Sequence, residues 1–433
     1  QLSLMCRDTD FPPMSLDIYA TPGAKIKVTG TNPLIYTWRV DSPVKEQQEH
    51  NRFIEDSRDL WDEFQRLAIK ERSMRSASEA ERKALRTKSD SISSIINQRE
   101  LKLMKELPIS NVWMEKLLRL SMSLKYNSRF TNKEEILALY DRLNEEQKAS
   151  IEGQEIRVNL FPPKTVKEGD DMADADLFDL DGKVHHLADF KGKYMLLDFW
   201  SSGCGPCIMA LPEMKEIQEQ YKDRLTIISL SSDTQTRWKA ASTQHEMTWQ
   251  NLSDLKQTAG LYAVYDVNGI PNYVLISPKG KIVKMWSGYG KGSLKLKMRR
   301  YLDAPKREMS ITGDTNRKVV NYPSFESTNT DILEVKQVEL TDTATIVHFY
   351  AYYIPKYWIQ VSVNAKLVDE QGTSYTLQKA DGITPGKHFF LPESGEAEFS
   401  LTFKPLPLKT KSFNFTEGTA KNDWQINGIK LTK

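Results

Sequence analysis

The chain has 433 residues, which at about 100 to 200 residues per domain predicts roughly three domains. Its 60 lysines and arginines against 58 aspartates and glutamates leave a formal charge of +2, so charge indicates neither a nucleic-acid-binding surface nor an acidic disordered chain. The apolar runs are far shorter than the roughly 18 residues that a membrane span needs. Mean hydropathy is −0.53, and we expect a chain that does not span a bilayer. Because the sequence opens at Gln1, any export signal is expected upstream or already removed.

Three cysteines are too few for the disulfide framework of a small secreted domain. Cys6 is expected to be a small buried hydrophobe or an unpaired thiol. Cys204 and Cys207 form a C-x-x-C pair, but Cys6 and the six histidines supply no second pair at the spacing of zinc ligands. We therefore expect no metal and no other cofactor.

The N-terminal part predicts short strands followed by helices. Residues 1–43 form a β-rich segment, with strands at 2–6, 15–19 and 25–30, that is too small for a core of its own. It is expected to be a truncated domain or to pack on a later part of the chain. Residues 44–162 have a helical period, and the first helix is expected to run unbroken to Met74. Its apolar positions are Phe53, Leu60, Phe64, Leu67 and Met74.

Capping patterns predict where the other helices of this region begin. Ser76 and Glu79 have the spacing of a capping box, ahead of a helix that ends at Pro108. Ser110 is expected to cap the next helix, and Thr131 with Glu134 to form another capping box. A coiled coil is the alternative, but the apolar spacing is not a strict heptad, which favours packed helical hairpins.

Residues 165–304 alternate strands and helices, as an α/β domain does. Buried strands are expected at 194–200 and 225–231 with an amphipathic helix at 206–222 between them, which makes a βαβ unit. A hairpin at 272–277 and 281–286 and a helix at 294–302 complete the domain. Residues 305–329 are polar and are expected to be a linker. Residues 330–433 show period-two alternation broken by turn signals, which predicts an all-β sandwich.

The C-x-x-C pair stands at the start of a helix that follows a buried strand. A cysteine at this place faces the free N–H groups of the helix, which favour its thiolate. Helix N-termini and C-x-x-C geometry lower a thiol pKa from about 8.5 to between about 3.5 and 7.5. Cys204 is therefore the expected nucleophile at neutral pH, and Cys207, one turn into the helix, is expected to resolve the mixed disulfide.

The segment LLDFWSSGCGPCIMALPEM resembles the active-site segment of thioredoxins. Asp198 stands where that family has a buried carboxylate that exchanges protons with the resolving thiol, and Pro212 matches its helix-kinking proline. The sequence Gly269-Ile270-Pro271-Asn272 matches its cis-proline loop, which positions the substrate chain. The resemblance also implies that four residues contact the substrate: Trp200, Gly205, Pro206 and Ile270.

The resemblance covers about 140 residues and is closer to the TlpA and ResA branch and its AhpC/TSA-related relatives than to a minimal thioredoxin. This branch implies a thiol-disulfide oxidoreductase of the bacterial periplasm or cell envelope. It also implies protein disulfide or dithiol substrates and an electron donor in the membrane or envelope, without nucleic acid. The order of domains, with the string LPESGEAEFSLTF, also resembles multidomain thioredoxin-like envelope proteins of Gram-negative gut bacteria.

Two positions depart from the family pattern. Gly203 replaces the tryptophan that usually precedes the first cysteine, and Ala210 stands where ResA-like members have a glutamate. Asp198 is then the only nearby acid expected, and a role in cytochrome c maturation is not inferred. The rival hypothesis is a non-catalytic scaffold whose β-domain binds a partner or a glycan.

Other polar and aromatic residues have structural explanations. His185 and His186 precede a strand, one expected inward and one outward. Gly288, Gly290 and Gly292 have no acidic partner at the spacing of a dinucleotide site and predict the start of a helix. The aromatic side chains of the β-domain could form a binding platform, but burial against a neighbouring domain is the favoured expectation. These are Tyr350, Tyr352 and Trp358.

Overall fold

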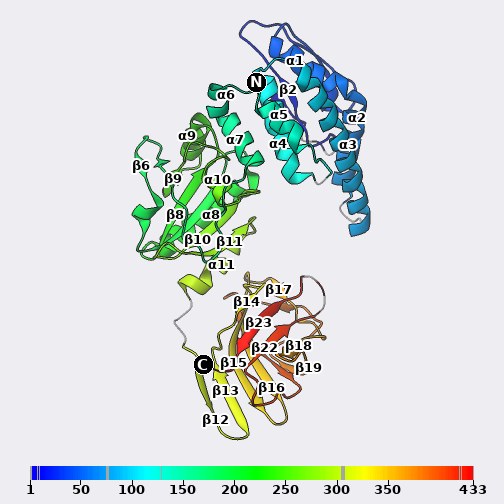
Figure 1. The fold of residues 1–433 in the computed structure, drawn as a ribbon. Coiled ribbons are helices and arrows are strands. Elements are labelled where there is room, and N and C mark those ends of the chain that lie inside the picture. The colour runs from blue at the N-terminus through cyan, green and yellow to red at the C-terminus, as the bar shows by residue number, and fades with distance from the viewer. Residues whose placement is uncertain are drawn as a thin grey trace.

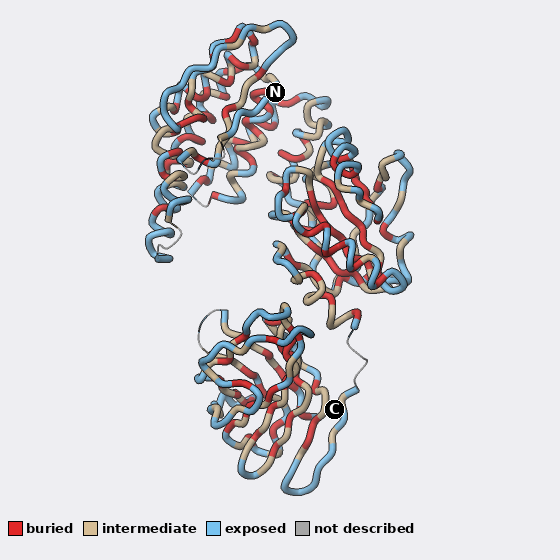
Figure 2. The backbone as a smooth tube through the Cα atoms, turned by 180° about the vertical axis from the view of Figure 1, so that it is seen from behind, coloured by how far each residue is buried: buried red, intermediate tan, exposed pale blue. Residues whose placement is uncertain are grey.

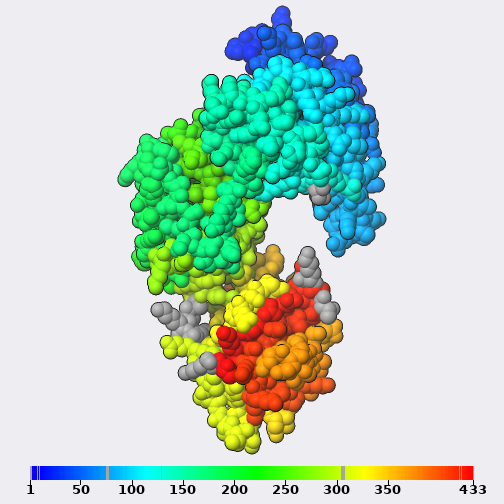
Figure 3. Space-filling model, viewed as in Figure 1, coloured from blue at the N-terminus to red at the C-terminus, as the bar shows by residue number. Residues whose placement is uncertain are grey.

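The computed structural model describes residues 2–6, 8, 10–74, 78–127, 129–303, 308–418, 420 and 422–432. In Figure 1 the chain forms a helical N-terminal region, a central α/β unit and a C-terminal sheet, in that order. The space-filling view is hollowed on the side between the helical region and the C-terminal sheet (Figure 3). No helix within the described ranges is long and apolar enough to cross a membrane.

The first 43 residues form two small antiparallel sheets that pack on the helices that follow. Strand β1 (Leu2–Leu4) pairs with β2 (Leu16–Ile18), and β3 (Lys27–Thr29) pairs with β4 (Arg39–Asp41). A short 3-10 helix η1 (Ile35–Thr37) lies in the connection from β3 to β4. Cys6 is half-buried against Leu16 and its neighbours, so it is neither fully buried nor disulfide-bonded. The segment packs on the helices that follow it, through bonds such as those from the Tyr19 and Tyr36 backbone N–H groups to Gln47 and Gln65.

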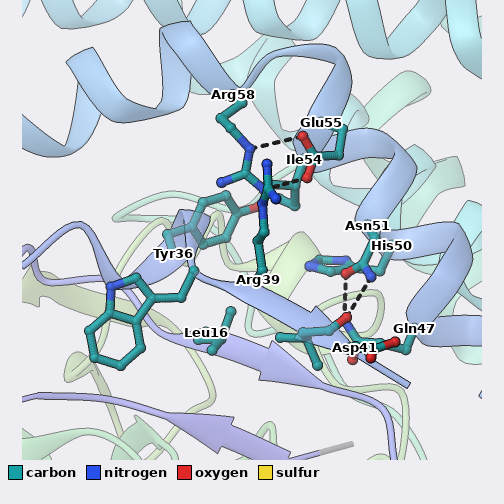
Figure 4. A pocket seen from close by; sticks show the side chains of 12 residues that line it. Leu16, Tyr36, Arg39, Asp41, Gln47, His50, Asn51, Ile54, Glu55 and Arg58 are labelled. Atoms are coloured by element: carbon teal, nitrogen blue, oxygen red, sulfur yellow. Dashed lines mark hydrogen bonds and ion pairs between the residues drawn. The ribbon is translucent and has the colours of Figure 1, made fainter. Parts of the chain in front are cut away.

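Side chains of the first two helices hold this segment in place. The Asn51 amide donates to the Val40 carbonyl at 2.8 Å. Arg58 donates to both oxygens of Glu55 (Figure 4). The buried Gln47 accepts the Tyr19 amide N–H at 2.8 Å. A pocket of about 400 Å³ lies between these elements. Among its charged side chains Arg58 and Glu55 form an ion pair, and Arg58 also donates to the Thr37 carbonyl, so the pocket is part of the packing of the segment.

Seven helices follow within the described residues up to 160, and their bounds differ from the expectations in places. They are α1 (Lys45–Asp56), α2 (Arg58–Ser73), α3 (Glu79–Glu106), α4 (Asn111–Tyr126), α5 (Lys133–Tyr140), α6 (Glu145–Ala149) and α7 (Ile151–Leu160). The single helix expected from 44 to Met74 is broken at Ser57, whose backbone leaves helical geometry. The expected cap Ser76 lies outside the described residues, and the capping box is formed by Ser78 with Glu81. Ser110 caps α4 as predicted, but α5 follows Asn132 and not Thr131.

A smaller apolar cluster lies between α2 and α3. The end of α3 packs with α1, α4, α5 and α7 around a larger apolar core and not along a coiled-coil seam. Trp113, Leu117, Ile136 and Ile156 are fully buried in it, which joins α4 to α5 and α7. Beneath them Glu100, almost completely buried, forms ion pairs with Lys116 and Arg119. Packed hairpins are therefore the correct interpretation.

The central unit is a five-stranded sheet with order β11-β10-β7-β8-β9. Strands β7 (Tyr194–Trp200), β8 (Leu225–Ser231) and β9 (Gln250–Leu252) are parallel, and β10 (Asn272–Ile276) and β11 (Ile282–Ser287) form the predicted antiparallel hairpin. Figure 2 shows the buried strands at the centre, with exposed helix surface around them. The helices are α8 (Gly205–Tyr221), α9 (Gln235–Gln244), α10 (Leu261–Val264) and α11 (Ser293–Leu302). A small hairpin of β5 (Leu177–Phe178) and β6 (Val184–His185) and a 3-10 helix η2 (Leu187–Phe190) precede β7.

The C-terminal part is all-β, as predicted, but two details differ. Its strands form one continuous antiparallel sheet of ten, in the order β12-β13-β15-β16-β21-β19-β18-β22-β23-β14, which curls around a single core in place of two separate sheets. Residues expected as a linker supply β12 (Ser310–Gly313), β13 (Arg317–Asn321) and β14 (Ser327–Thr328). These short, polar strands lie at or near the sheet edges, where one exposed face weakens the apolar alternation.

The other strands of this part have the following bounds: β15 (Leu333–Thr341), β16 (Thr345–Tyr352), β17 (Trp358–Ile359), β18 (Lys366–Asp369), β19 (Ser374–Asp381), β20 (Phe389–Phe390), β21 (Glu396–Phe403), β22 (Ser412–Thr416) and β23 (Gln425–Lys430). Strands β17 and β20 pair with each other outside the ten-stranded sheet. The sheet is tied to the central unit by Asp331, which accepts from Lys284 and Lys297.

Candidate functional site

The two cysteines of the C-G-P-C segment meet at the start of α8. Cys204 is the N-cap residue, its Sγ accepts the Cys207 backbone N–H at 3.1 Å, and the two residues are joined by a disulfide. Cys204 is 8% exposed and Cys207 2%. The sulfur nearer to solvent is thus also the one that faces the unpaired N–H groups of the helix, which stabilise a thiolate.

The turn before Cys204 is held by groups that the sequence pattern did not single out. The Ser202 backbone N–H donates to Asp233 Oδ2 at 2.6 Å, and the Ser202 hydroxyl donates to Oδ1 at 3.1 Å. The buried Tyr262 hydroxyl lies 2.8 Å from the Trp200 carbonyl oxygen and 2.9 Å from that of Leu230. These bonds fix the end of β7, and therefore the position of the cysteine pair, against β8 and α10.

Asp198 is a buried carboxyl group on β7. Side chains alternate along a strand, so Asp198 shares a sheet face with Leu196 and Trp200. Leu196 packs under α8, and Trp200 packs against both cysteines, so Asp198 lies beneath the helix that carries Cys207. Ser229 on the neighbouring strand donates to Asp198 Oδ2 at 2.7 Å.

Burial raises the pKa of Asp198 to about 7, and the Ser229 hydrogen bond acts in the opposite direction. The indole N–H of Trp249 donates to Ser229 Oγ at 2.8 Å and orients that hydroxyl. A carboxyl group that titrates near neutral pH can both take up and release a proton under physiological conditions. Sequence reasoning missed both residues, because only the register of β7 against β8 places Ser229 beside Asp198 and only the fold brings Trp249, just before β9, to Ser229.

The proline loop has the predicted backbone. The Ile270–Pro271 peptide bond is cis. Ile270 packs against the cluster of Trp200, Cys204 and Cys207, and the Pro271 carbonyl accepts the Gly288 N–H at 2.8 Å. The structure therefore brings the loop, which is distant in sequence, against the disulfide.

The residues expected to touch a substrate divide into two groups. Gly205 and Pro206 are exposed and Ile270 is half-buried, so these three are accessible. Trp200 is completely buried, so the prediction that its side chain contacts the substrate directly is wrong. The cause is its place as the last residue of β7, where its side chain packs against Cys204, Cys207 and Trp238.

A second buried acid lies on α8 but is committed to helix capping. Ala210 is fully buried and carries no acid, whereas Glu213 accepts the backbone N–H groups of Gly292, Leu294 and Lys295 at 2.8 to 3.1 Å. Gly292 is the N-cap of α11 with φ +82°, a conformation that favours glycine. The glycine pattern at 288–292 thus marks the start of a helix, as predicted.

The remaining histidines and aromatic residues singled out in the sequence make ordinary packing and polar contacts. His185 lies 2.8 Å from Asp179 and stacks on Phe190, while His186 is exposed. Tyr352 is buried under the Arg299 guanidinium of α11, so it packs against the neighbouring unit as favoured. Trp358 is 46% exposed and stacks on His388. In the described part of the chain no group of three or more His, Cys, Asp or Glu side chains is arranged to hold a metal ion.

The central unit is similar to known proteins. Residues 169–285 match the model of the AhpC/TSA family. The thioredoxin-like protein YneN of Bacillus subtilis is 31% identical over 121 residues, which cover 27% of this chain and 69% of that protein. The thiol-disulfide oxidoreductase ResA of Geobacillus thermodenitrificans is 32% identical over 139 residues, 31% of this chain and 79% of its own. The solved thioredoxin domain of a thiol-disulfide oxidoreductase from Bacteroides vulgatus is 28% identical with a TM-score of 0.30, and covers 32% of this chain and 100% of that one.

Proposed function

The chain belongs, through its central unit, to the ResA-like thiol-disulfide oxidoreductases of the thioredoxin superfamily, and we propose that Cys204 and Cys207 are the redox pair that performs its disulfide exchange. The observation that carries the proposal is the position of this pair, with Cys204 as the N-cap of α8 and Cys207 buried behind it. Its substrates are protein disulfides or dithiols.

Exchange proceeds in two steps that conserve electrons. In the reducing direction the Cys204 thiolate attacks one sulfur of a substrate disulfide, and the other substrate sulfur leaves as a thiolate. The Cys207 thiol then loses its proton and attacks Cys204 Sγ. This step forms the Cys204–Cys207 disulfide and releases the second substrate sulfur, so the substrate gains two electrons and the pair loses two. In the oxidising direction the same steps run backwards.

Asp198 is the proposed acceptor of the proton from Cys207. It lies beneath α8 on the face that carries the cysteines, and its pKa of about 7 suits transfer in both directions. Because Glu213 is committed to capping α11, Asp198 is the buried acid on this face that is available for the transfer.

The substrate chain is proposed to lie across the cis-proline loop. Pro271 fixes the backbone of the loop, so that Ile270 presents its main chain beside Cys204, and an extended segment can pair with it. Gly205 and Pro206 leave the approach to the sulfur open because they carry little side chain. We place the protein in the bacterial periplasm or cell envelope, with an envelope electron donor, on the basis of the branch it resembles.

The test of this function is trapping. In a Cys6→Ala background the Cys207→Ser variant retains the nucleophile and lacks the resolving thiol, so it is expected to accumulate mixed disulfides with substrate proteins on Cys204. The matched control is the variant that also carries Cys204→Ser. Equal amounts of reducible adducts in the two variants would overturn the proposal.

A further inference from the structure

A cleft of about 450 Å³ lies where the helical region meets the central unit. One wall is formed by α4 and the end of α7, and the other by α10 and the residues that follow it. Its lining is largely apolar, and it includes Met122, Tyr126, Leu160, Pro162, Tyr262 and Val267.

The two walls are held together by polar contacts. Glu155 Oε1 accepts the Thr258 hydroxyl at 2.5 Å and its backbone N–H at 3.2 Å, and Lys125 lies 3.4 Å from Asp266. These bonds connect α4 and α7 with the segment that leads into the proline loop. The cleft is therefore a feature of the docked units and not of either alone.

The cleft adjoins the disulfide through two connections. Val267 lines it, and Ile270, three residues later, packs on the cysteine pair. Three peptide units span at most about 11 Å. Tyr262 also lines the cleft, while its hydroxyl bonds the Trp200 carbonyl oxygen at the end of β7.

The rim of the cleft exposes large apolar side chains. Met122 is 44% exposed and Tyr126 58%. Methionine adapts to varied apolar surfaces, and tyrosine offers an apolar ring with a polar tip, a combination that is common where polypeptides bind. A small charged ligand is less suited, since two of the three charged side chains that line the cleft, Lys125 and Asp266, already face each other, and the third is a single lysine, Lys133.

We propose that this cleft binds an apolar stretch of the substrate polypeptide, next to the cysteine that is bonded to Cys204. The inference rests on the proposed function and adds its substrate preference. A chain that crosses the cis-proline loop continues past Val267, where alternate side chains of an extended segment can enter the cleft. Disulfides flanked by leucine or phenylalanine are then preferred over those flanked by small polar residues.

The experiment compares three disulfides as substrates of the reduced full-length protein. Two are peptides in which one cysteine carries a fluorescent thiol through a disulfide, flanked by Leu-Phe-Leu or by Ser-Gly-Ser, and the third is hydroxyethyl disulfide. We expect the second-order rate constant for single-turnover reaction of the reduced protein with the apolar peptide to exceed that with the polar peptide by about tenfold, the effect of burying about one large apolar side chain.

The test variant is Met122→Ser/Tyr126→Ser, which is expected to reduce this preference to about twofold or less while hydroxyethyl disulfide reacts as before. Ile95 and Tyr357 are exposed to the same 44% and 58% away from the cleft, so Ile95→Ser/Tyr357→Ser is the matched control and should keep the full preference. If the two double variants showed the same preference for the apolar peptide and both reacted normally with hydroxyethyl disulfide, the proposal that the cleft binds substrate would be overturned. The proposed function would not be affected.

Two other outcomes are also decisive. Failure of the wild-type protein with all three disulfides would remove the proposed function, and the cleft proposal with it. Sedimentation of the wild type as a dimer that only Met122→Ser/Tyr126→Ser dissociates would show that a second copy covers the cleft, which would overturn the peptide assignment.

Discussion

The Ser229 hydroxyl donates to Asp198 Oδ2 across two parallel strands, at 2.7 Å, while its oxygen accepts the Trp249 indole N–H at 2.8 Å. A hydroxyl carries one hydrogen. Since the Ser229 oxygen accepts the Trp249 N–H, its own hydrogen is free to point at the Asp198 carboxyl group. The buried acid of the site is thus held in a defined geometry by Ser229 and, through it, by Trp249.

Replacement of Ser229 by alanine is expected to raise the pKa of Asp198 above its value of about 7. The hydrogen bond favours the charged carboxylate, and its loss leaves burial unopposed. In stopped-flow measurements of how fast Cys207 resolves a mixed disulfide, the midpoint of the pH dependence should move upward. Trp249→Phe should shift it in the same direction and less far. An unchanged midpoint in a folded Ser229→Ala protein would contradict the relay.

Replacement of Asp198 by asparagine is expected to stabilise the oxidised protein at neutral pH. The carboxyl group has a pKa of about 7 in the fold and about 3.9 in the unfolded chain. Between these values the native state holds a proton that the unfolded chain has released, so the wild-type free energy of unfolding falls as pH rises from about 4 to about 7. Each unit of separation is worth about 1.4 kcal/mol.

Urea unfolding of the two proteins at a series of pH values checks this prediction. The stability difference in favour of Asp198→Asn should grow between about pH 4 and pH 7 and level off above. A difference that stays constant across this range would show that Asp198 does not titrate there.

Asp331 is expected to be the main polar tie between the central unit and the C-terminal sheet. Burial alone would raise its pKa, but the Lys284 hydrogen bond and charge, together with Lys297, hold the pKa below its usual value. Asp331→Asn should cost about 1.5–3 kcal/mol, the range for hydrogen bonds to charged groups. Limited proteolysis between the two units should then become faster.

The exposed pair of Lys356 and Glu393 supplies the control, since both side chains are more than two-thirds exposed and Glu393→Gln should change little. The Asp331 contribution is present above the unfolded pKa of about 3.9 and is lost as pH falls through the lower folded value. Equal cleavage rates for Asp331→Asn and Glu393→Gln would show that the Asp331 ion pairs do not hold the central unit and the C-terminal sheet together.

The parts of the site that the sequence predicted are local or follow from the family resemblance. The cysteine pair, the buried Asp198 and the cis peptide at Pro271 belong to short segments whose residues identify them. Their supporting residues could not be found in this way. Ser229 and Trp249 join Asp198 through strand register, and Glu213 reaches Gly292 across the packing of two helices. Such contacts depend on tertiary structure.

The errors in the fold have similar causes. The break at Ser57 leaves the apolar period almost unchanged, so periodicity alone predicts one helix. The strands at 310–328 are short and polar because they lie at or near sheet edges, and they resemble a linker in composition. The place of Trp200 in the motif predicts that it contacts the substrate, whereas the completed sheet buries its side chain.

The central claim is tested most directly by the redox equilibrium of Cys204 and Cys207. In the Cys6→Ala protein the pair is equilibrated against dithiol buffers of graded potential, and its state is measured by thiol alkylation and mass. We predict one reversible two-electron transition, at about −270 mV for a reductant or about −120 mV for an oxidant. A pair that neither forms nor loses its disulfide over this range would contradict the account, and the β-domain would then become the candidate working surface.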